Sequence, residues 1–468
     1  MRLTRPSVFV DCPSISFQRL YSSSRIIRQN DVLFLRQKGT KGPKWHLTSP
    51  LRPDARIRLG YGASVNASDL IGRRILDSVV DSSDRKVDIL EPTLGSYILN
   101  SERMATPIYP HHANFIVSLL DLNLSQPNEE DYDPETNEPL PPMEIFEAGT
   151  GMGSLTLHLA RALTAANPAV PSMLRDGLCS ARYKPEGRGL DLSEEVQAAY
   201  DSYRSSRRAV LHTLDQNTRH SRAANQLVRR YRRSIYYPTV DFHTGSISDY
   251  ISPRLTETNG QPIFSHAILD LPSVEDYAEP VIQALHPNGL LVVFAPSISQ
   301  IARFQAWASQ TKQPVRQERV IELDVSTTAD GVLDTGGGRE WDVKQVTPKN
   351  DPNAAPVQVM RPKVGDRISG GGFVGVYRRW PVKQTVTQVE SVGGVASDAE
   401  APSESALEES VSNAEETSES VQEEILSDAE ASSESIREEN SSNAQESTEA
   451  SIDEAEIKPS TSVYVNNT

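Results

Sequence analysis

The sequence has few residues that form disulfides, bind metals or cross membranes. Its 468 residues include two cysteines, Cys12 and Cys179, and neither has a partner at metal-ligand spacing. This composition excludes a disulfide framework and a cysteine-based zinc site, and it is typical of a reducing interior. No apolar run approaches the roughly 18 residues that a membrane-spanning helix needs. We therefore expect no metal and no membrane as partners.

Positive charge is scarce in the chain as a whole, but the imbalance is local. The formal net charge is -16, which by itself argues against a nucleic-acid partner. From Glu390 onward, however, 21 acidic residues face two basic ones, whereas the rest of the chain has 45 basic and 42 acidic residues. The body is therefore mildly basic, and the overall acidity does not exclude RNA.

The two ends of the chain have unusual compositions. Residues 1–30 contain five arginines and one acid, Asp11, among serines and apolar residues. This pattern predicts a mitochondrial transit peptide and a matrix location, with an ordinary disordered N-terminus and a nuclear location as the alternatives. Residues 386–468 repeat an acidic motif every 15 residues, as in residues 397–400 and 412–415. We expect a disordered solvating tail, with nucleic-acid mimicry as the alternative.

The pattern of apolar and turn residues in the body of the chain changes near residue 106. Residues 31–105 alternate short apolar runs with turn residues, which predicts a small β-rich domain. Residues 106–385 alternate apolar strands with helical patterns, which predicts an α/β domain with a mostly parallel sheet. Residues 126–142 and 166–209 are predicted to be surface-loop insertions. The expected strands are 144–147, 210–214, 240–243, 266–269 and 290–294, and the expected helices are 154–165, 219–231, 277–285 and 299–311.

A glycine-rich turn is the clearest local motif. It reads Glu147-Ala148-Gly149-Thr150-Gly151-Met152-Gly153-Ser154, after an apolar strand and before a predicted helix. Glycines let the backbone approach a ligand closely, and the first helical N–H groups point at that ligand. The dinucleotide fingerprint needs glycine at position 154 or 156, where serine and threonine stand. The pattern resembles motif I of class I methyltransferases instead, with a purely structural turn as the alternative. The resemblance implies that S-adenosylmethionine is bound by Glu147, Gly149, Gly151, Met152, Gly153, Ser154 and Leu155.

Two later strands end in an aspartate. Asp215 follows the second predicted strand, where such a fold needs an acid for the ribose hydroxyls of the cofactor. Asp270 follows the fourth strand, at the sheet edge where ligands of open α/β sheets bind, so it is placed beside the cofactor and for catalysis. For both aspartates the alternative is a helix cap. Ser246 and Ile247, after the third strand, are predicted to flank the adenine of the cofactor.

The segment Asp-Leu-Pro at 270–272, with Glu-Ala-Gly-Thr-Gly at 147–151, resembles the tRNA adenosine-58 N1-methyltransferase family, TrmI-like, in a fungal-type mitochondrial form. The resemblance covers roughly residues 69–380 without the insertions. It implies a Rossmann-like class I methyltransferase with a seven-stranded, mostly parallel sheet. Further similar segments lie at residues 91–93, 106–110, 286–290, 295–300 and, as closing strands, 339–343.

The resemblance implies methyl transfer from S-adenosylmethionine to N1 of adenosine 58 in tRNA. Adenine N1 is a neutral nucleophile, so the chemistry needs a carboxylate that accepts from the exocyclic amine rather than a strong base. The resemblance gives this role to Asp270, gives Tyr109 and Gln300 as walls of the base pocket, and implies a homotetramer or a heterotetramer with a non-catalytic paralogue. The alternatives are another RNA or protein target, or a non-catalytic RNA-binding partner subunit.

Three segments depart from the family pattern. His111-His112 stand where Lys-Asp is usual, Gly370-Gly371-Gly372 stand where His-Thr-Gly is frequent, and Met152 stands where motif I usually has serine. The first two departures lie on the substrate side and leave the target base open. The glycines and Asp-Leu-Pro are intact, which favours an active enzyme over a decayed subunit.

An arginine-rich segment follows the second predicted strand. Nine arginines and one acid, Asp215, lie between residues 204 and 233. Arginine neutralises phosphate and binds it bidentately. The alternative is a solvated helix face, which is the usual origin of a charge run. We expect an RNA contact through Arg229, Arg230, Arg232 and Arg233.

Overall fold

The computed structural model describes nine stretches of the chain, all within one compact unit, Met1–Gln384. The expected transit peptide up to residue 24, most of the insertion at 126–142 and the acidic tail lie outside the described residues, so those expectations stay predictions. Among the described residues, no helix is both long and apolar enough to cross a bilayer. The described residues are 25–38, 43–124, 141–184, 189–327, 332–333, 335–337, 340–347, 353–363 and 369–382.

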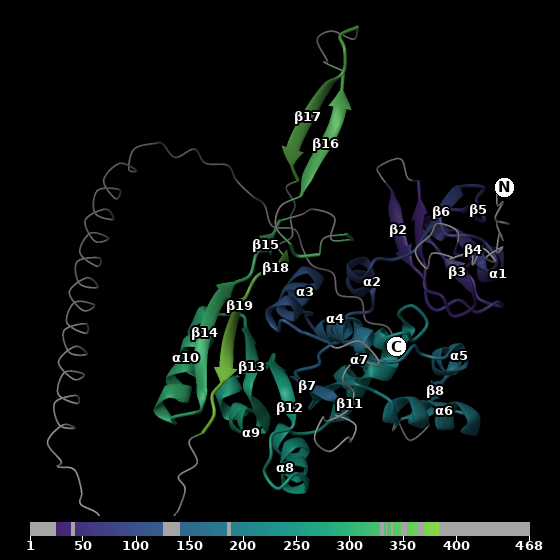
Figure 1. Cartoon of the computed structure of the whole chain (residues 1–468). Helices are drawn as coiled ribbons and strands as arrows, with labels where there is room; N and C mark the ends of the chain where they lie inside the picture. The colour runs from purple at the N-terminus through teal and green to yellow at the C-terminus, as the bar shows by residue number, and fades with distance from the viewer. Residues whose placement is uncertain are drawn as a thin grey trace, which may run out of the picture. The chain divides into compact units, whose positions relative to one another are not determined.

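The first part of the chain forms a small antiparallel β-domain (Figure 1). Four strands pair in the order β2-β1-β6-β5, and β3 pairs with β4 beside the short helix α1. Leu33 and Leu35 are fully buried in one apolar cluster with Val87 and Ile89, and Leu35 lies opposite Ile89. The spacing of two places each pair on one face of its strand. The elements are β1 (Phe34–Gln37), β2 (Lys44–Leu47), β3 (Arg56–Arg58), β4 (Ser64–Asn66), α1 (Ala67–Leu70), β5 (Ser78–Val80) and β6 (Lys86–Leu90).

The β-domain is shorter than the sequence suggested. Helix α2 (Leu94–Asn100), which was expected within it, packs into the core of the second domain together with α3 (Pro110–Leu119). The Thr93 hydroxyl caps α2 by accepting from the Ser96 amide, and the Tyr97 hydroxyl donates to the Leu227 carbonyl, 2.8 Å away. These contacts fix the segment before the glycine turn against the second domain.

The second domain contains the expected seven-stranded sheet, so the predicted fold class is confirmed. Its strand order is β11-β10-β7-β12-β13-β19-β14. The first five strands are parallel, and β19 is antiparallel to both of its neighbours. The strands are β7 (Met143–Ala148), β10 (Ala209–Asp215), β11 (Val240–Thr244), β12 (Phe264–Leu269), β13 (Leu285–Ala295), β14 (Val315–Glu322) and β19 (Phe373–Arg379).

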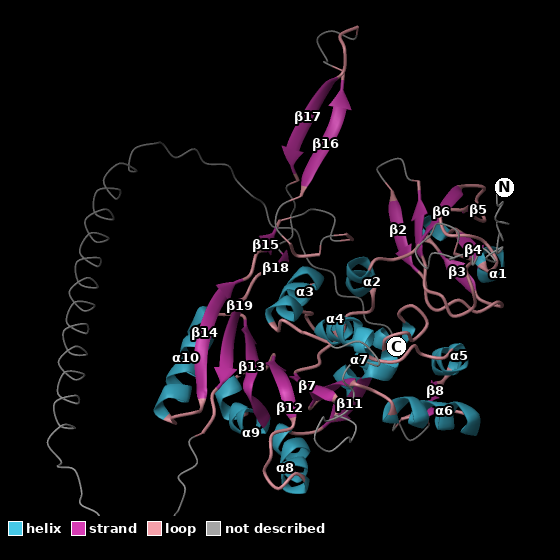
Figure 2. Ribbon diagram, viewed as in Figure 1, coloured by secondary structure: helices cyan, strands magenta, loops and turns pink. Residues whose placement is uncertain are grey.

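Helices cover both faces of this sheet (Figure 2). Ile145 of β7 packs into one apolar core with α3, α4 and α7, whereas its neighbour Phe146 packs into the other core with α8, α9 and α10. The chain leaves the central strand β7 toward β10 on one side and later returns to β12 on the other, so a crevice opens beyond the carboxyl end of β7. The helices are α4 (Ser154–Leu163), α7 (Thr218–Arg230), α8 (Ile247–Glu257), α9 (Ala278–Ala284) and α10 (Ile298–Gln310).

Two segments differ from expectation. Residues 166–209, expected as a surface loop, contain α5 (Ser172–Ser180), the strand pair β8 (Arg182–Tyr183) and β9 (Leu190–Asp191), and α6 (Glu194–Ser205). Leu174 and Leu178 are fully buried, because their spacing of four places both on the helix face that meets the core.

The segment 339–343 was expected among the closing strands of the sheet. Instead, β16 (Trp341–Val346) pairs with β17 (Val357–Pro362) in a separate two-stranded hairpin, and β14 and β19 close the sheet. The alternation of apolar residues in β16 does form a strand, but Trp341 and Val343 remain exposed. A further strand pair, β15 (Val325–Ser326) and β18 (Ser369–Gly370), links this region to the sheet.

Candidate active site

The glycine-rich turn joins β7 to α4 at the carboxyl edge of the sheet. Gly149, Gly151 and Gly153 have positive φ angles of 92°, 53° and 89°, which glycine adopts without the strain of a side chain. A Cβ on Gly149 would lie 2.0 Å from the Asp270 carbonyl oxygen, and one on Gly153 would lie 2.8 Å from Ala224 Cβ. A Cβ on Gly151 would meet nothing closer than 4.0 Å, so Gly151 alone borders open space.

Asp215 ties this turn to the second strand of the sheet. The Gly151 amide donates to its Oδ2 at 2.9 Å, and the Asn217 amide donates to its Oδ1 at 2.7 Å. His220 Nδ1 lies 3.6 Å from the same Oδ2. Each carboxylate oxygen has a further lone pair, so Asp215 can accept from two hydroxyl groups without giving up these contacts.

A cavity of about 390 Å³ lies in front of the turn and within the usual range for ligand pockets. The structure brings together five of the predicted cofactor residues around it: Gly149, Gly151, Asp215, Ile247 and Asp270. The residues fit S-adenosylmethionine, because open backbone at Gly151 suits its amino-acid part, Asp215 suits the ribose diol, and the apolar Ile247 suits the adenine ring. The remaining lining residues are Ala105, Thr106, Ala148, Leu214, Gln216, Asn217, His220, Gly245, Leu271, Pro272 and Tyr277.

Asp270 stands directly after β12, beside the glycine turn. Its amide donates to the Ala148 carbonyl at 2.9 Å, so the strand hydrogen bonds fix its position. Burial raises the pKa of Asp270 to about 7, and the nearby Asp215 carboxylate adds to the rise. Its carboxyl group is therefore poised to change charge near neutral pH, a property that clusters at functional sites.

Glu147 lies behind the turn instead of lining the cavity. It is 1% exposed, and the Thr156 hydroxyl donates to its Oε2 at 2.7 Å. Burial raises the pKa of Glu147 to about 7, although hydrogen bonds from Thr156 and Thr213 oppose the rise. Thr213 in turn bonds the Thr150 hydroxyl of the turn at 2.6 Å. Glu147 therefore supports the turn through a chain of hydroxyl groups.

Five other predicted cofactor residues do not line the cavity. The Ser154 hydroxyl donates to the backbone just before α3, and Ser246 caps α8. Met152 and Leu155 are buried in the apolar core, and the position of Gly153 is set by its contact with α7. The five are Met152, Gly153, Ser154, Leu155 and Ser246.

A second cavity, of about 360 Å³, adjoins the first. Tyr109 lines it, where the base pocket was expected, and so does His112. Asp270 and Thr106 line both cavities. A carboxylate therefore stands where a bound cofactor and an acceptor base would meet. The other lining residues are Pro107, Ile108, Phe294, Pro296, Gly370, Gly371 and Gly372.

Gln300 was predicted to line the base pocket, and the structure corrects this. Its side-chain oxygen accepts from the Ser297 amide at 3.2 Å, and the Ser297 side chain completes a capping box at the start of α10. The Ser-x-x-Gln spacing is the sequence signature of that box, so the signal was present in the sequence.

The predicted RNA contact of Arg229 is wrong. Its side chain is buried, and Nη1 donates to the Leu178 carbonyl at 2.9 Å and to the Ala181 carbonyl at 2.6 Å. These carbonyls lie at the carboxyl end of α5, where backbone acceptors lack helical partners and attract a cation. The Arg229 guanidinium is therefore hydrogen-bonded to the protein backbone and is not available to bind phosphate.

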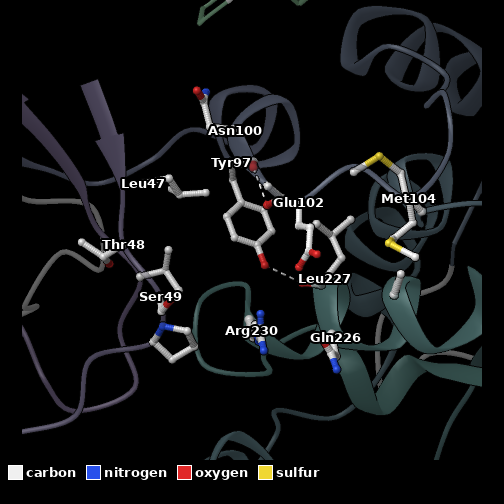
Figure 3. Close-up of a pocket in the computed structure, with 15 residues that line it drawn as sticks. Leu47, Thr48, Ser49, Tyr97, Asn100, Glu102, Met104, Gln226, Leu227 and Arg230 are labelled. Atoms are coloured by element: carbon white, nitrogen blue, oxygen red, sulfur yellow. Dashed lines mark hydrogen bonds between the residues drawn. The ribbon is translucent and has the colours of Figure 1, made fainter. Parts of the chain in front are cut away.

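Of the other three predicted arginines, two form ion pairs within the protein and one is exposed. Arg232 pairs with Glu91 at 3.5 Å, and Arg233 pairs with Asp176. Arg230 is exposed and borders a third cavity, of about 200 Å³, between α2, α7 and the segment after β2 (Figure 3). This third cavity shares no residue with the other two, so it is separate from Asp270.

His220, Phe294 and Tyr277 line the cavities and were not predicted from the sequence, whereas His112 was noted there only as a substrate-side departure from the family pattern. His220 lies on the first turn of α7, close to Asp215, and Tyr277 follows the Asp-Leu-Pro segment. Both positions lie just beyond strands that carry a predicted site residue, so scanning one helical turn further would have found them. Phe294 lies at the end of a predicted strand, and no local pattern marked it as a lining residue.

Comparison with known proteins finds relatives in sequence and in fold. No family model matches the chain. Two curated tRNA (adenine(58)-N(1))-methyltransferases TrmI, from two strains of Thermus thermophilus, are each 28% identical over 259 residues, which cover 55% of this chain and 69% of the relative. An O-methyltransferase structure from Thermotoga maritima has a TM-score of 0.47 and 13% identity, with coverage of 77% and 96%. The TrmI structure from Aquifex aeolicus has a TM-score of 0.42 and 12% identity, with coverage of 76% and 100%.

The order of the seven strands, the glycine turn and the two aspartates at strand ends define a class I, S-adenosylmethionine-dependent methyltransferase. Within that class the sequence match decides the relationship. The chain is similar in sequence to the TrmI tRNA (adenine-58-N1)-methyltransferases, so the resemblance to these enzymes is confirmed, whereas its fungal-type mitochondrial form stays a prediction.

Proposed function

We propose that this chain transfers the methyl group of S-adenosylmethionine to N1 of adenosine 58 in tRNA. The proposal rests mainly on Asp270, which lines both the cofactor cavity and the acceptor cavity. The TrmI relatives are named for the same reaction.

The chemistry requires orientation and charge stabilisation. S-adenosylmethionine supplies a methyl group on a positively charged sulfur. The lone pair of adenine N1 would form the new bond to that carbon while the carbon–sulfur bond breaks, its electron pair staying on the sulfur of S-adenosylhomocysteine. Positive charge would then develop over N1 and the exocyclic amine. The Asp270 carboxylate accepts a hydrogen bond from the amine, which stabilises this charge and aligns the ring. The hydrogen-bonded turn and Asp215 hold the donor side in place.

The decisive experiment incubates the full chain with methyl-labelled S-adenosylmethionine and unmodified tRNA, and then maps the labelled nucleotide. We expect label at N1 of adenosine 58, and we expect none with Asp270→Ala. Label on another RNA position or on protein would overturn the proposed target. Absence of calorimetric heat with S-adenosylmethionine would overturn the enzymatic proposal itself.

For the RNA contact, we propose the outer face of α7 in place of the arginine run. Arg219, Arg222 and Arg230 are exposed, and their spacing places them on one side of the helix. The Arg222 guanidinium lies 4.5 Å from the centre of the Tyr183 ring. None of the three arginines has an ion-pair partner among the described residues. Because α7 begins beside Asp215, this basic face runs from the cofactor cavity outward.

Charge removal tests this face. The triple variant Arg219→Gln, Arg222→Gln, Arg230→Gln should raise KM for tRNA at least tenfold, leave kcat unchanged, and reduce the salt dependence of binding by up to about 0.9 logarithmic units per lost phosphate contact. Lys312→Gln, an exposed cation at the carboxyl end of α10, is the matched control. An unchanged KM and salt dependence would contradict the proposed face.

We also propose that the protein acts as a tetramer, of this chain alone or with a non-catalytic paralogue, as the family resemblance implies. Light scattering of the purified chain distinguishes the two, because a chain that needs a paralogue gives a smaller mass alone. The composition of residues 1–30 supports import into the mitochondrial matrix. A fluorescent protein fused to residues 1–30 should enter mitochondria, and a diffuse or nuclear signal would contradict this.

A further inference from the structure

Two segments that depart from the family pattern meet in the acceptor cavity. His112, at the start of α3, and Gly370, in β18, both line it. A Cβ on Gly370 would lie 2.5 Å from His112 Cε1 and 2.8 Å from the Asp324 carbonyl oxygen. The imidazole ring therefore lies directly against the glycine backbone, and no larger residue fits at position 370 while the ring holds this position.

The His112 ring is buried but only partly hydrogen-bonded. It is 2% exposed, and among the described residues its Nε2 has no hydrogen-bond partner. The ring does interact with the backbone carbonyl of Asp324. Since Nε2 is unpartnered, the nitrogen that meets this carbonyl is Nδ1. A buried polar atom without a partner is costly in a folded protein and calls for an explanation.

The protonation of the ring follows from these contacts. Burial lowers the pKa of His112, so the ring is neutral at physiological pH, although the Asp324 carbonyl opposes this shift. A carbonyl oxygen only accepts hydrogen bonds, so Nδ1 carries the single ring proton. Nε2 is then left with a lone pair. The residues that line the acceptor cavity thus include two hydrogen-bond acceptors, the Asp270 carboxylate and the buried Nε2 of His112.

We propose that His112 determines base specificity, its Nε2 accepting a hydrogen bond from the exocyclic amine of the base that is methylated. This inference rests on the proposed function. An adenine amine has two N–H groups, so Asp270 and His112 can each accept one. A keto base would direct oxygen lone pairs at both acceptors and would be rejected, because a site built for an N–H group leaves its acceptors unpaired without one.

The test pairs a change in the enzyme with a change in the base. His112→Phe keeps an aromatic ring against Gly370 but removes both nitrogens, and His112→Gln restores an acceptor. The same Phe substitution at His111, which is exposed and does not line the cavity, is the matched control. Single-turnover methylation is measured at saturating S-adenosylmethionine on tRNA that carries adenosine or purine riboside, which lacks the amine, at the target position.

We expect His112→Phe to slow methylation of the adenosine substrate about tenfold or more and to leave the purine riboside substrate unchanged. His112→Gln should recover part of the rate, and His111→Phe should match the wild type on both. An equal loss on both substrates would show that the ring is only structural and overturn the inference, as would no loss on either. The proposed function is judged separately by whether the wild-type chain forms N1-methyladenosine at all.

Discussion

The cofactor cavity and the acceptor cavity share Asp270 but are built in different ways. The cofactor cavity takes its walls from the ends of β7, β10, β11 and β12 and the turns that follow them. The acceptor cavity combines the segment around Tyr109, the end of β13 and the glycines next to β18. The cofactor cavity is formed by the ends of neighbouring strands in one sheet. The acceptor cavity forms only when segments that are distant in the sequence pack together.

This difference separates two kinds of recognition. On the donor side, backbone geometry at Gly151 and a hydrogen-bonded carboxylate at Asp215 present the same chemistry whatever the acceptor is. On the acceptor side, side chains lie against glycines, as His112 does against Gly370. Changes there alter the pocket without touching the donor. The comparison predicts that variants of the two cavities separate into effects on cofactor affinity and effects on turnover or base choice.

Asp270 is the strongest test because it belongs to both cavities. Asp270→Ala should lower kcat about 1000-fold, the upper range for removing one group that stabilises developing charge, with a loss of cofactor affinity of only a few-fold. Calorimetry with S-adenosylmethionine and single-turnover methylation measure the two effects. Asp249→Ala, an exposed aspartate in the first turn of α8, is the control. Retained methylation would remove Asp270 from the chemistry.

Asp215 should produce the opposite pattern. Asp215→Ala removes the acceptor of the Gly151 amide and the expected partner of the ribose hydroxyls. Loss of a hydrogen-bonded charged partner costs roughly 1.5–3 kcal/mol, so KM for S-adenosylmethionine should rise about 10- to 100-fold while KM for tRNA stays constant. A matching rise in KM for tRNA would mean that the two cavities are not separable in this way.

The contrast between the two cavities also explains which parts of the site could be predicted from the sequence. The strands expected at 144–147, 210–214 and 266–269 are present within one or two residues, because buried parallel strands are short continuous apolar runs. Asp215 and Asp270 then follow from strand order alone. The acceptor cavity could not be assembled this way, because no local pattern indicates that residues near 112 and 370 touch.

The errors have physical causes as well. The charge run at 229–233 resembled a phosphate-binding surface, but composition does not show which arginine faces inward, and Arg229 caps α5 instead. The helices at residues 166–209 were not predicted because Pro and Gly lie at the start and in the middle of the insertion and are typical of loops. The apolar pair Leu174 and Leu178 is the local pattern that indicates a buried helix there. Glu147 was predicted to bind the cofactor because of its motif, but it is the penultimate residue of β7 and its side chain is buried behind the turn.

The pH dependence tests whether the two cavities are coupled through charge. Asp270 must be ionised to accept from the amine, and burial together with Asp215 raises its pKa to about 7. The methylation rate at saturating S-adenosylmethionine should therefore rise nearly tenfold per pH unit well below 7 and level off above it. Asp215→Asn removes the charge that raises this pKa, so its profile should shift toward lower pH. An unshifted profile would show that Asp215 does not influence Asp270.

Substitution of Glu147 should have the smallest effect on activity. It tests whether the cofactor cavity depends on this buried carboxyl group behind the glycine turn. Its pKa is raised to about 7 by burial, so the folded state is penalised for ionising it. The penalty begins above the ordinary glutamate pKa near 4.3 and is complete above about 7. Glu147→Gln should therefore stabilise the protein by about 1–3 kcal/mol at pH 8 and have no such effect at pH 4.

Denaturant titrations at the two pH values measure this change, with calorimetry to show that cofactor affinity stays within about threefold. Glu144→Gln is a useful contrast, because hydrogen bonds and charges from His212 and Arg254 lower the pKa of Glu144 despite its burial, so this variant should lose stability at pH 8. A large loss of cofactor affinity in Glu147→Gln would instead place the Glu147 carboxylate in direct contact with the cofactor. The donor cavity would then depend on a charged side chain as well as on its backbone, and its contrast with the acceptor cavity would be weaker.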